Sequence, residues 1–219
     1  MRVVIAGGHG KIALILEKLL AARGDSAVGL VRNPDHVTDV EATGAQAVVL
    51  DLERASVDDV AAVVRGADAV VFAAGAGPGS GAARKETVDR DAAILLADAA
   101  ETAGVDRYVM VSALAADDRS LDGGYDEVFR VYMQAKSAAD ADVRARTGLR
   151  STIVRPGTLT DEPGTAKVTI AESTGRGAVP REDVARVLLA VLHEPETAGR
   201  TFELISGDTA IDAALHPAR

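Results

Sequence analysis

A tyrosine and a lysine four residues apart carry the first chemical signal in this 219-residue chain. In the stretch "VYMQAKSAAD", Tyr132 precedes Lys136, and on a helix this spacing places both side chains on one face. A phenol beside an ammonium group can act as a proton donor when a carbonyl is reduced. The spacing also suits an ordinary amphipathic helix with a tyrosine and a lysine at its edge. Both interpretations stay open until the rest of the chain is considered.

The stretch "GGHGKIA" contains a second pattern with a specific physical use. Gly7 permits a tight turn, Gly10 lets the backbone approach a pyrophosphate, and Ala13 allows a helix to pack closely on a strand. The amino end of the following helix then faces the phosphates, where Lys11 either assists or is only exposed. Glycines needed only for a turn would also fit, but the pattern follows the first predicted strand and opens the first predicted helix. We therefore predict a dinucleotide site.

The end of the second predicted strand distinguishes between the two nicotinamide dinucleotides. A carboxylate there would bind the 2′-hydroxyl of the adenosine ribose in NAD. The segment reads "GLVRNP", which places Arg32 and Asn33 at that position. Arg32 can form charge-assisted hydrogen bonds with the 2′-phosphate of NADP, or it can be a solvated surface residue. We predict NADP, with NAD less favoured, and we expect Asp51 and Leu52 in "VLDLE" to flank the adenine unless Asp51 is only a turn residue.

Alternating strands and helices must position these residues. We predict strands at 2–7, 27–31, 45–52, 67–75, 106–113, 149–157 and 200–206. We predict helices at 11–24, 34–44, 56–66 and 181–194, a long helix that ends near Gly104, and a further helix that carries Tyr132. Ser56 is the expected N-cap of the helix at 56–66. The strands are nearly continuously apolar, which is typical of a sheet that helices cover on both faces.

Repeated βα units predict an α/β fold with a doubly wound parallel sheet in three αβα layers. We expect a single domain over residues 1–219, since no long linker interrupts the pattern. Residues 156–180 are predicted to form a small irregular insertion on the substrate side. It would lie at the carboxyl edge of the sheet, where open α/β sheets bind ligands.

Composition limits the classes of partner. The net charge of -9 disfavours nucleic acid and acidic membrane surfaces, and the absence of cysteine fits a reducing cytoplasm. "MRVVIAGG" enters a strand almost at once, so we expect no signal peptide, and no apolar run approaches the roughly 20 residues of a membrane helix. No metal is predicted, because the histidines lack ligand spacing: His9, His36, His193 and His216. We expect a cytoplasmic monomer or homodimer that acts on a small molecule.

Together these motifs resemble the atypical short-chain dehydrogenase/reductase group, and specifically the small NAD(P)H-binding proteins similar to biliverdin reductase B and the NmrA-like proteins. Besides "GGHGKIA", the resemblance rests on "VRNP", "LDL", "VDRDAAILLADAA", "RYVMVSALAA", "AKSAADADVRARTGLRSTIVRPGTLTDEP" and "VPREDVARVLLAVLHEPETAGRTFEL". It covers nearly the whole chain. It implies a Rossmann-like fold with bound NAD(P), and it does not define the substrate.

The resemblance also implies roles for individual residues. Ser112 would orient the carbonyl, Tyr132 would donate a proton to the alkoxide, and Lys136 would bind the nicotinamide ribose and lower the pKa of the tyrosine. Pro156 and Gly157 are expected to fix a turn that faces the nicotinamide. The expected cofactor contacts are Gly7, His9, Gly10, Lys11, Ile12, Arg32, Asn33, Asp51, Leu52, Ala73, Ala74, Gly75, Lys136, Pro156, Gly157 and Thr158.

Alternatives remain for the catalytic residues. Ser112 can simply satisfy a backbone group, and Lys136 can bind the ribose without proton chemistry, in which case the proton comes from solvent. Asp89 occupies a position where catalytic relatives often carry an asparagine that supports a water relay to the lysine. A carboxylate cannot donate as an amide does, so the relay behind Tyr132 is weakened.

Three functions fit these observations. The leading hypothesis is an NADP(H)-dependent oxidoreductase acting on a small carbonyl, quinone or flavin-like acceptor. The second is a non-catalytic dinucleotide sensor that regulates a protein partner. The third is an epimerase or dehydratase of nucleotide sugars, which we rank lower because the segment after the sixth strand is short for a substrate domain.

Overall fold

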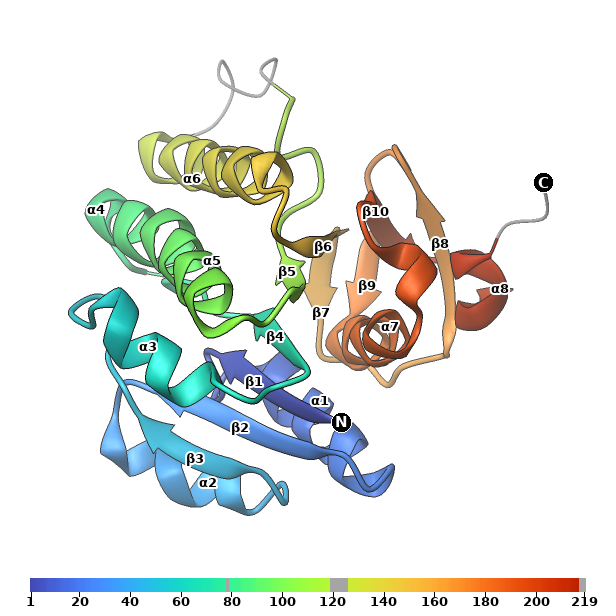
Figure 1. Ribbon diagram of the computed structural model, residues 1–219. Helices are drawn as coiled ribbons and strands as arrows, with labels where there is room; N and C mark the ends of the chain where they lie inside the picture. Colours follow the sequence, from blue (N-terminus) through green and yellow to red (C-terminus); the bar gives the residue numbers. More distant parts are fainter. Residues whose placement is uncertain (78, 119–125, 217–219) are drawn as a thin grey trace.

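The computed structural model describes residues 1–77, 79–118 and 126–216. A nine-stranded mixed sheet forms the centre of this structure (Figure 1). The seven predicted strands are present as β1 Arg2–Ala6, β2 Ser26–Val31, β3 Gln46–Val49, β4 Ala69–Phe72, β5 Arg107–Val111, β6 Arg150–Pro156 and β10 Thr201–Ser206. The described residues also form four strands that were not predicted: β7 Thr158–Thr160, β8 Lys167–Ala171, β9 Ala178–Pro180 and β11 Thr209–Ala210. Most of the predicted strands are buried along their length because helices cover both faces of the sheet.

The strand order creates the crevice that the predicted site requires. Across the main sheet the order is β11-β8-β10-β6-β5-β4-β1-β2-β3. β1 pairs in parallel with β2 on one side and with β4 on the other, so the winding direction reverses at β1. At such a switch point the loops that follow neighbouring strands diverge and leave room for a ligand. The predicted doubly wound α/β fold is confirmed, with parallel pairing from β3 through β10.

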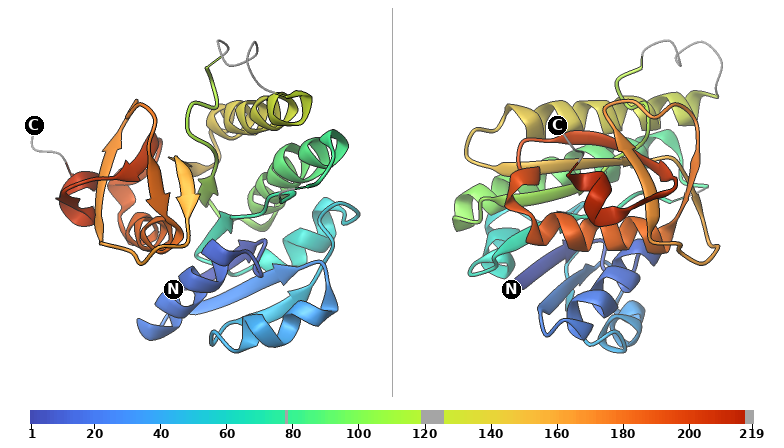
Figure 2. Two further views of the ribbon diagram at one scale, coloured as in Figure 1. Left: turned by 180° about the vertical axis from the view of Figure 1, so that it is seen from behind. Right: turned by 90° about the vertical axis from the view of Figure 1, so that its right-hand side faces the viewer.

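Two helical layers enclose the sheet (Figure 2). The helices are α1 Lys11–Ala22, α2 Val37–Glu41, α3 Val57–Val64, α4 Ala82–Arg84, α5 Ala92–Ala103, α6 Glu127–Ala145, α7 Arg181–His193 and α8 Ile211–Leu215. Buried side chains of α1 and α7 share one apolar cluster with one face of the sheet, and those of α3, α5 and α6 share a second cluster with the other face. Burial of these apolar faces is the main force that holds the layers together.

Residues 156–180 are not the irregular insertion that we predicted. β8 pairs antiparallel with β10 inside the main sheet, and β7 pairs with β9 in a separate two-stranded sheet. The strand signal is weak here because β8 reads "KVTIA" and fully buries only Val168. Pairing with β10, which lies far away along the chain, makes this half-polar segment a strand.

The helix predicted to end near Gly104 begins irregularly. α4 leads into a π-helical segment, Lys85–Asp91, which continues into α5. Gly104 ends α5 with a φ of 74°, the left-handed conformation that glycine adopts readily. π-helical turns frequently occur at functional sites because they redirect side chains. Here the segment brings Thr87 and Asp89 to the carboxyl edge of the sheet.

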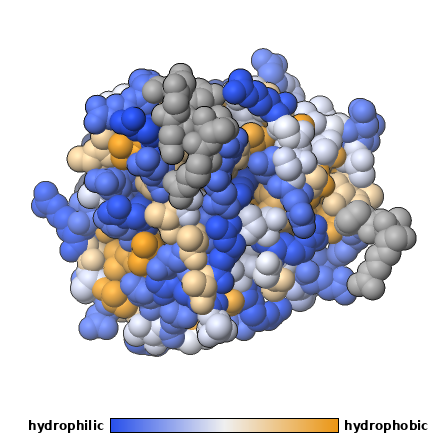
Figure 3. Space-filling model, turned by 90° about the horizontal axis from the view of Figure 1, so that it is seen from above, coloured by the Kyte–Doolittle hydropathy of each residue, from blue (hydrophilic) through white to orange (hydrophobic). Residues whose placement is uncertain are grey.

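The surface is mainly hydrophilic on the face shown in Figure 3, where apolar side chains lie in small groups. Among the described residues, the large apolar side chains that are exposed are Val49 on β3 and Val128 on α6. No helix within residues 1–77, 79–118 and 126–216 is long and apolar enough to span a bilayer. The face shown in Figure 3 presents mostly charged and polar groups to solvent.

Candidate functional site

The glycine loop between β1 and α1 has the backbone geometry that the sequence predicts. Gly7 has a φ of +83°, in the left-handed region that favours glycine. A Cβ atom at Gly7 would lie 2.6 Å from the Cα of Ala74, so a side chain would also collide with the segment after β4. The N–H of Gly10 donates to the carbonyl oxygen of Gly7 over 2.8 Å and closes the turn. Glycine is therefore required at position 7 for two independent reasons.

No side chain in the described part of the chain caps the amino end of α1. Gly10 is its N-cap, and the first turn carries no acidic residue. By contrast, Ser56 caps α3 as predicted, in a reciprocal capping box with Asp59. Free N–H groups and the helix dipole both attract negative charge at an uncapped amino end. This end of α1 therefore fits the pyrophosphate of a dinucleotide.

A pocket of about 270 Å³ opens beside this loop at the carboxyl edge of the sheet. It brings together ten of the predicted cofactor contacts: Gly7, His9, Gly10, Arg32, Asn33, Asp51, Leu52, Ala73, Ala74 and Gly75. It is completed by residues that sequence reasoning missed: Leu30, Val31, His36, Leu50, Glu53, Ala76, Arg84, Val88 and Ala92. The predicted contacts outside this lining are Lys11, Ile12, Lys136, Pro156, Gly157 and Thr158. The pocket corresponds to the adenosine and phosphate half of the predicted site.

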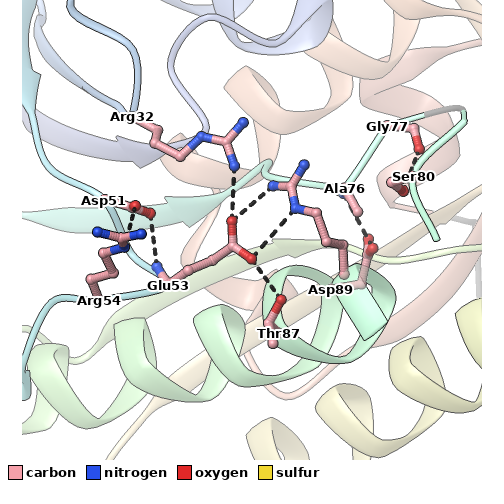
Figure 4. Close-up of polar contacts among 10 residues, drawn as sticks. Arg32, Asp51, Glu53, Arg54, Ala76, Gly77, Ser80, Thr87 and Asp89 are labelled. Atoms are coloured by element: carbon pink, nitrogen blue, oxygen red, sulfur yellow. Dashed lines mark hydrogen bonds and ion pairs between the residues drawn. The ribbon is translucent and has the colours of Figure 1, made fainter. Parts of the chain in front are cut away.

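Arg32 is not a freely solvated side chain. Its Nη1 donates to Oε2 of Glu53 over 2.9 Å (Figure 4). Nη2 of Arg84 donates to the same oxygen over 2.8 Å, and the hydroxyl of Thr87 donates to Oε1 over 2.7 Å. Partial burial acts to raise the pKa of Glu53, but the hydrogen bonds from Arg84 and Thr87 outweigh it and hold this pKa below its usual value. Glu53 is therefore a carboxylate bound between two guanidinium groups.

Two histidines of the pocket lining stack on one another. The rings of His9, from the glycine loop, and His36, from the 3₁₀ turn Pro34–His36, lie 3.6 Å apart at an interplanar angle of 11°. Nε2 of His9 also lies 2.8 Å from Oδ2 of Asp39 on α2. The stack ties the glycine loop to the segment after β2, so the two walls of the pocket support one another.

Lys11 contacts a carboxylate on the other side of the glycine loop. Its Nζ lies 2.6 Å from Oδ2 of Asp161, whose other oxygen accepts from Nη1 of Arg181 over 2.7 Å. The side chains of Lys11 and Asp161 are both exposed. Exposed ion pairs contribute little to stability, so Lys11 is free to exchange this partner for a phosphate at little cost.

Lys136 is buried in an ion pair. Its Nζ lies 3.3 Å from Oδ1 of Asp89 and donates to the carbonyl oxygen of Val111 over 3.3 Å. Lys136 is 3% exposed and Asp89 is 1% exposed. Oδ2 of Asp89 accepts a hydrogen bond from the N–H of Ala76, which lines the pocket. Asp89 therefore connects the pocket wall to Lys136, in the position where the sequence departs from the pattern of catalytic relatives.

Tyr132 lies one turn before Lys136 on α6, as its spacing predicts. The ammonium groups of Lys136 and Lys85 lie 5.9 Å and 5.3 Å from the centre of its ring. Burial raises the pKa of Tyr132 above its usual value; Lys136 opposes this shift, and the carboxylate of Asp89 reinforces it. From the sequence we expected Lys136 to lower the pKa of Tyr132. In the structure burial outweighs the effect of Lys136, and the pKa stays above its usual value.

Ser112 follows β5, but its hydroxyl is buried rather than open to the pocket. Its Oγ makes no hydrogen bond of normal geometry with the described residues, but it is close enough to Asp140 to act to lower the pKa of that carboxyl. Burial nevertheless raises the pKa of Asp140 above its usual value, against the effect of Arg155, whose Nε donates to Oδ2 of Asp140 over 2.8 Å. The predicted role of Ser112 at a substrate carbonyl remains a prediction.

Pro156 and Gly157 do not form the predicted turn. β6 runs through Pro156 and β7 starts at Thr158. The N–H groups of Gly157 and Thr158 donate to the carbonyl oxygens of Leu204 and Gly177, each over 2.9 Å. These donors are already used, because β10 and the segment before β9 pack directly against the end of β6. A Cβ atom at Gly157 would lie 2.3 Å from the carbonyl oxygen of Gly177, so this close approach explains the glycine.

The sequence contained a weak signal for only one of the missed charged residues. Glu53 follows directly after the predicted adenine contacts Asp51 and Leu52, so its place beside them in the pocket lining was foreseeable. Arg84 lies in the glycine-rich segment after β4, and no motif marks it. It reaches the pocket from the end of α4, where its side chain bonds to Glu53.

Comparisons with known proteins agree with this geometry. The family model described as NAD(P)H-binding matches residues 7–195. The chain is 39% identical to the "Uncharacterized sugar epimerase YhfK" of Bacillus subtilis strain 168, covering 98% of this chain and 99% of the relative. A solved "Putative NAD-dependent epimerase/dehydratase" from Bacillus halodurans is similar over 100% of both chains, at 35% identity and a TM-score of 0.90.

The oxidoreductase ylbE from Lactococcus lactis has a similar structure, with 27% identity and a TM-score of 0.88 over 99% of this chain and 95% of that one. The fold, the uncapped α1 and the family match all support a nicotinamide dinucleotide as the cofactor. The chain therefore belongs to the NAD(P)H-binding family, in agreement with its predicted resemblance to the atypical short-chain dehydrogenase/reductase group.

Proposed function

We propose that this protein is an NADP(H)-dependent oxidoreductase that reduces a small carbonyl, quinone or flavin-like acceptor. The proposal rests on Asp89, which joins the two halves of the site. One oxygen of Asp89 accepts from Ala76 in the pocket wall, and the other lies 3.3 Å from the ammonium group of Lys136. Asp89 thus links the pocket wall to Lys136, and this link supports a site in which an acceptor lies between the nicotinamide and the Tyr132–Lys136 pair.

Each part of the site has a distinct role in this proposal. A bound nicotinamide supplies the hydride. The amino end of α1 binds the pyrophosphate, Arg32 binds the 2′-phosphate, and Lys136 binds the nicotinamide ribose. Tyr132 orients the acceptor and offers it a proton.

The charges around Tyr132 favour acceptors that stabilise their own negative charge. Asp89 offsets the charge of Lys136, so a tyrosinate at position 132 gains little stabilisation, and the raised pKa makes Tyr132 a weaker acid. A quinone or flavin-like acceptor delocalises the charge that the hydride brings and can take its proton from solvent. A simple aldehyde develops a localised alkoxide and depends more on Tyr132.

NADPH consumption across a panel of quinones, flavins and aldehydes tests the proposal. We expect turnover with at least one class, and faster turnover with quinones or flavins than with aldehydes. Tight NADPH binding without turnover of any acceptor would contradict the proposed activity.

Replacing Tyr132 by phenylalanine tests its part in proton donation. With an aldehyde we expect kcat to fall roughly 100-fold, because general acid catalysis typically contributes a factor of that order. With a quinone we expect a change of less than about threefold, because the proton comes from solvent. Steady-state kinetics with both acceptors measure the difference. Equal losses for both acceptors would show that the variant disturbs the pocket rather than proton donation.

Arg32→Ala tests the choice of cofactor. We expect the Kd for NADP⁺ to rise roughly tenfold or more, because a charge-assisted contact with the 2′-phosphate is lost, and the Kd for NAD⁺ to change little. Isothermal titration calorimetry with both cofactors measures this. An equal loss for NADP⁺ and NAD⁺ would refute the contact with the 2′-phosphate.

A dinucleotide sensor is the second candidate, and the raised pKa of Tyr132 favours it over a strong acid catalyst. Pull-downs with NADP⁺ and NADPH would then capture different protein partners. The epimerase alternative has less support, because the segment after β6 supplies β8 to the main sheet and leaves only a short region for a substrate domain.

A further inference from the structure

Two arginines from different segments share one carboxylate at the edge of the cofactor pocket (Figure 4). Arg32 follows β2, Arg84 ends α4, and both donate to Oε2 of Glu53, over 2.9 Å and 2.8 Å. Thr87 donates its hydroxyl to the other oxygen over 2.7 Å. Glu53 thus occupies a site built from two guanidinium groups and a hydroxyl, which are donors that bind any small oxyanion.

This cluster is accessible from the pocket. Arg32, Glu53 and Arg84 all line it. Their side chains are 54%, 22% and 39% exposed, so the two cations are more accessible than the carboxylate between them. The neighbouring carboxylate of Asp51 points elsewhere: it accepts from the N–H of Glu53 over 3.1 Å and pairs with Arg54 at 3.7 Å.

We propose that Arg84 and Glu53 determine how strongly the protein selects for a 2′-phosphate. Arg84 joins Arg32 in binding the 2′-phosphate of the adenosine ribose, and Glu53 is the internal anion that this phosphate displaces. The inference rests on the proposed preference for NADP(H) and deepens it, because it names the residues that set the strength of that preference.

The competition follows from charge and geometry. A guanidinium group presents paired N–H donors that suit a carboxylate and a phosphate equally well. A phosphate dianion beside the carboxylate of Glu53 would be repelled, so that carboxylate must leave the two arginines when the phosphate binds. A ribose with a free 2′-hydroxyl lets Glu53 stay and accept a hydrogen bond. Glu53 therefore weakens binding of NADP(H), which carries the 2′-phosphate, and does not weaken binding of NAD(H).

Ligands that carry only the adenosine half test this without any turnover. We would titrate 2′,5′-ADP and 5′-AMP into the wild type, Arg84→Gln and Glu53→Gln by calorimetry at low ionic strength. Glu86→Gln and Arg90→Gln are matched controls, because this ion pair lies on the π-helical segment that follows Arg84, spans 3.7 Å and is outside the pocket lining. Arg84→Lys keeps the charge and removes the paired donors, and thermal unfolding verifies that each variant is folded.

We expect Arg84→Gln to weaken 2′,5′-ADP binding about tenfold or more and to change 5′-AMP binding less than about twofold. Arg84→Lys should lie between the wild type and Arg84→Gln. Glu53→Gln should strengthen 2′,5′-ADP binding about threefold to tenfold. The controls should change either affinity by less than about twofold.

Two results would overturn the inference: equal losses of both ligands in Arg84→Gln, or weaker 2′,5′-ADP binding in Glu53→Gln. Failure of the proposed function gives a different pattern. If the protein turns over no acceptor, the expected changes in affinity for 2′,5′-ADP and 5′-AMP still stand, because these ligands bind without turnover. If Arg32→Ala loses affinity equally for both ligands, the preference for NADP(H) itself is contradicted. If Arg32→Ala weakens 2′,5′-ADP binding selectively and Arg84→Gln does not change it, the preference for NADP(H) stands and only the role of Arg84 is overturned.

Discussion

Lys136→Met is expected to lower the free energy of unfolding by roughly 3 to 5 kcal/mol. Lys136 and Asp89 are 3% and 1% exposed, so methionine would leave the carboxylate buried without its cation. Removing one partner of a buried ion pair is far more costly than removing both. Urea denaturation of the wild type and the variant measures the difference.

The double variant Asp89→Asn/Lys136→Met is the control for this prediction. Asparagine keeps an oxygen that accepts from the N–H of Ala76 and removes the buried charge. We expect the double variant to recover most of the stability that Lys136→Met loses. A loss below about 1 kcal/mol in the single variant would show that water or another group already compensates Asp89.

The double variant also tests the functional role of Lys136. If Lys136 binds the nicotinamide ribose, the double variant should bind NADP⁺ more weakly than the wild type does. Its affinity for 2′,5′-ADP, which lacks the nicotinamide half, should stay unchanged. Equal affinities of the wild type and the double variant for NADP⁺ would assign Lys136 a purely structural role.

Glu17→Gln is expected to abolish a pH dependence of stability that the wild type shows near neutral pH. Glu17 lies on α1, is 0% exposed, and has one carboxyl oxygen without a hydrogen-bond partner among the described residues. Burial raises its pKa from 4.5 to about 8, although the hydrogen bond from Thr43 opposes the shift. The folded protein therefore holds the proton up to about pH 8, whereas the unfolded chain releases it at its ordinary pKa of 4.5.

Between these two pKa values the unfolded chain binds fewer protons than the folded protein. The free energy of unfolding of the wild type should therefore fall as pH rises, by about 1.4 kcal/mol per pH unit, and level off above the folded pKa. Glutamine has the same shape and does not ionise. The stability of Glu17→Gln relative to the wild type should thus rise by roughly 3 to 5 kcal/mol across the whole range.

Urea denaturation of both proteins from about pH 5 to about pH 8 measures this difference. Glu41→Gln, which changes an exposed residue on α2, is the matched control and should show a constant difference from the wild type. A pH-independent difference for Glu17→Gln would contradict the raised pKa and would mean that Glu17 is ionised in the folded protein.

Glu17 also links stability to the cofactor site. A Cβ atom at Gly29 of β2 would lie 2.6 Å from Oε1 of Glu17, and one at Gly8 of the glycine loop would lie 3.2 Å from the same oxygen. The buried acid therefore occupies space that two glycines leave free beneath the loop. Ionisation of Glu17 would bring a negative charge directly under the phosphate-binding turn, so we expect cofactor affinity to weaken in the same pH range.

Much of the fold was predictable because its signals are local. Seven strands, the capped start of α3 and the end of α5 at Gly104 follow from apolar runs, a serine at a helix start and a glycine at a helix end. The glycine loop was equally readable, since Gly7 and Gly10 act through backbone conformation within a few residues. β8 was missed because its strand character comes from pairing with β10 rather than from its own pattern.

The sequence by itself determined the βα alternation, the glycine loop and the side chains that follow each strand, because these depend on periodicity and on residues adjacent in the chain. The strand order, with its reversal at β1, came only from the tertiary structure. Only the tertiary structure decided how those side chains are paired. It brings Glu53 to Arg32, 21 residues away, and to Arg84, 31 residues away, and it buries Asp89 against Lys136. These pairings set the charge that a 2′-phosphate and Tyr132 experience, and electrostatic energy depends on distance and burial in space, which no local pattern encodes.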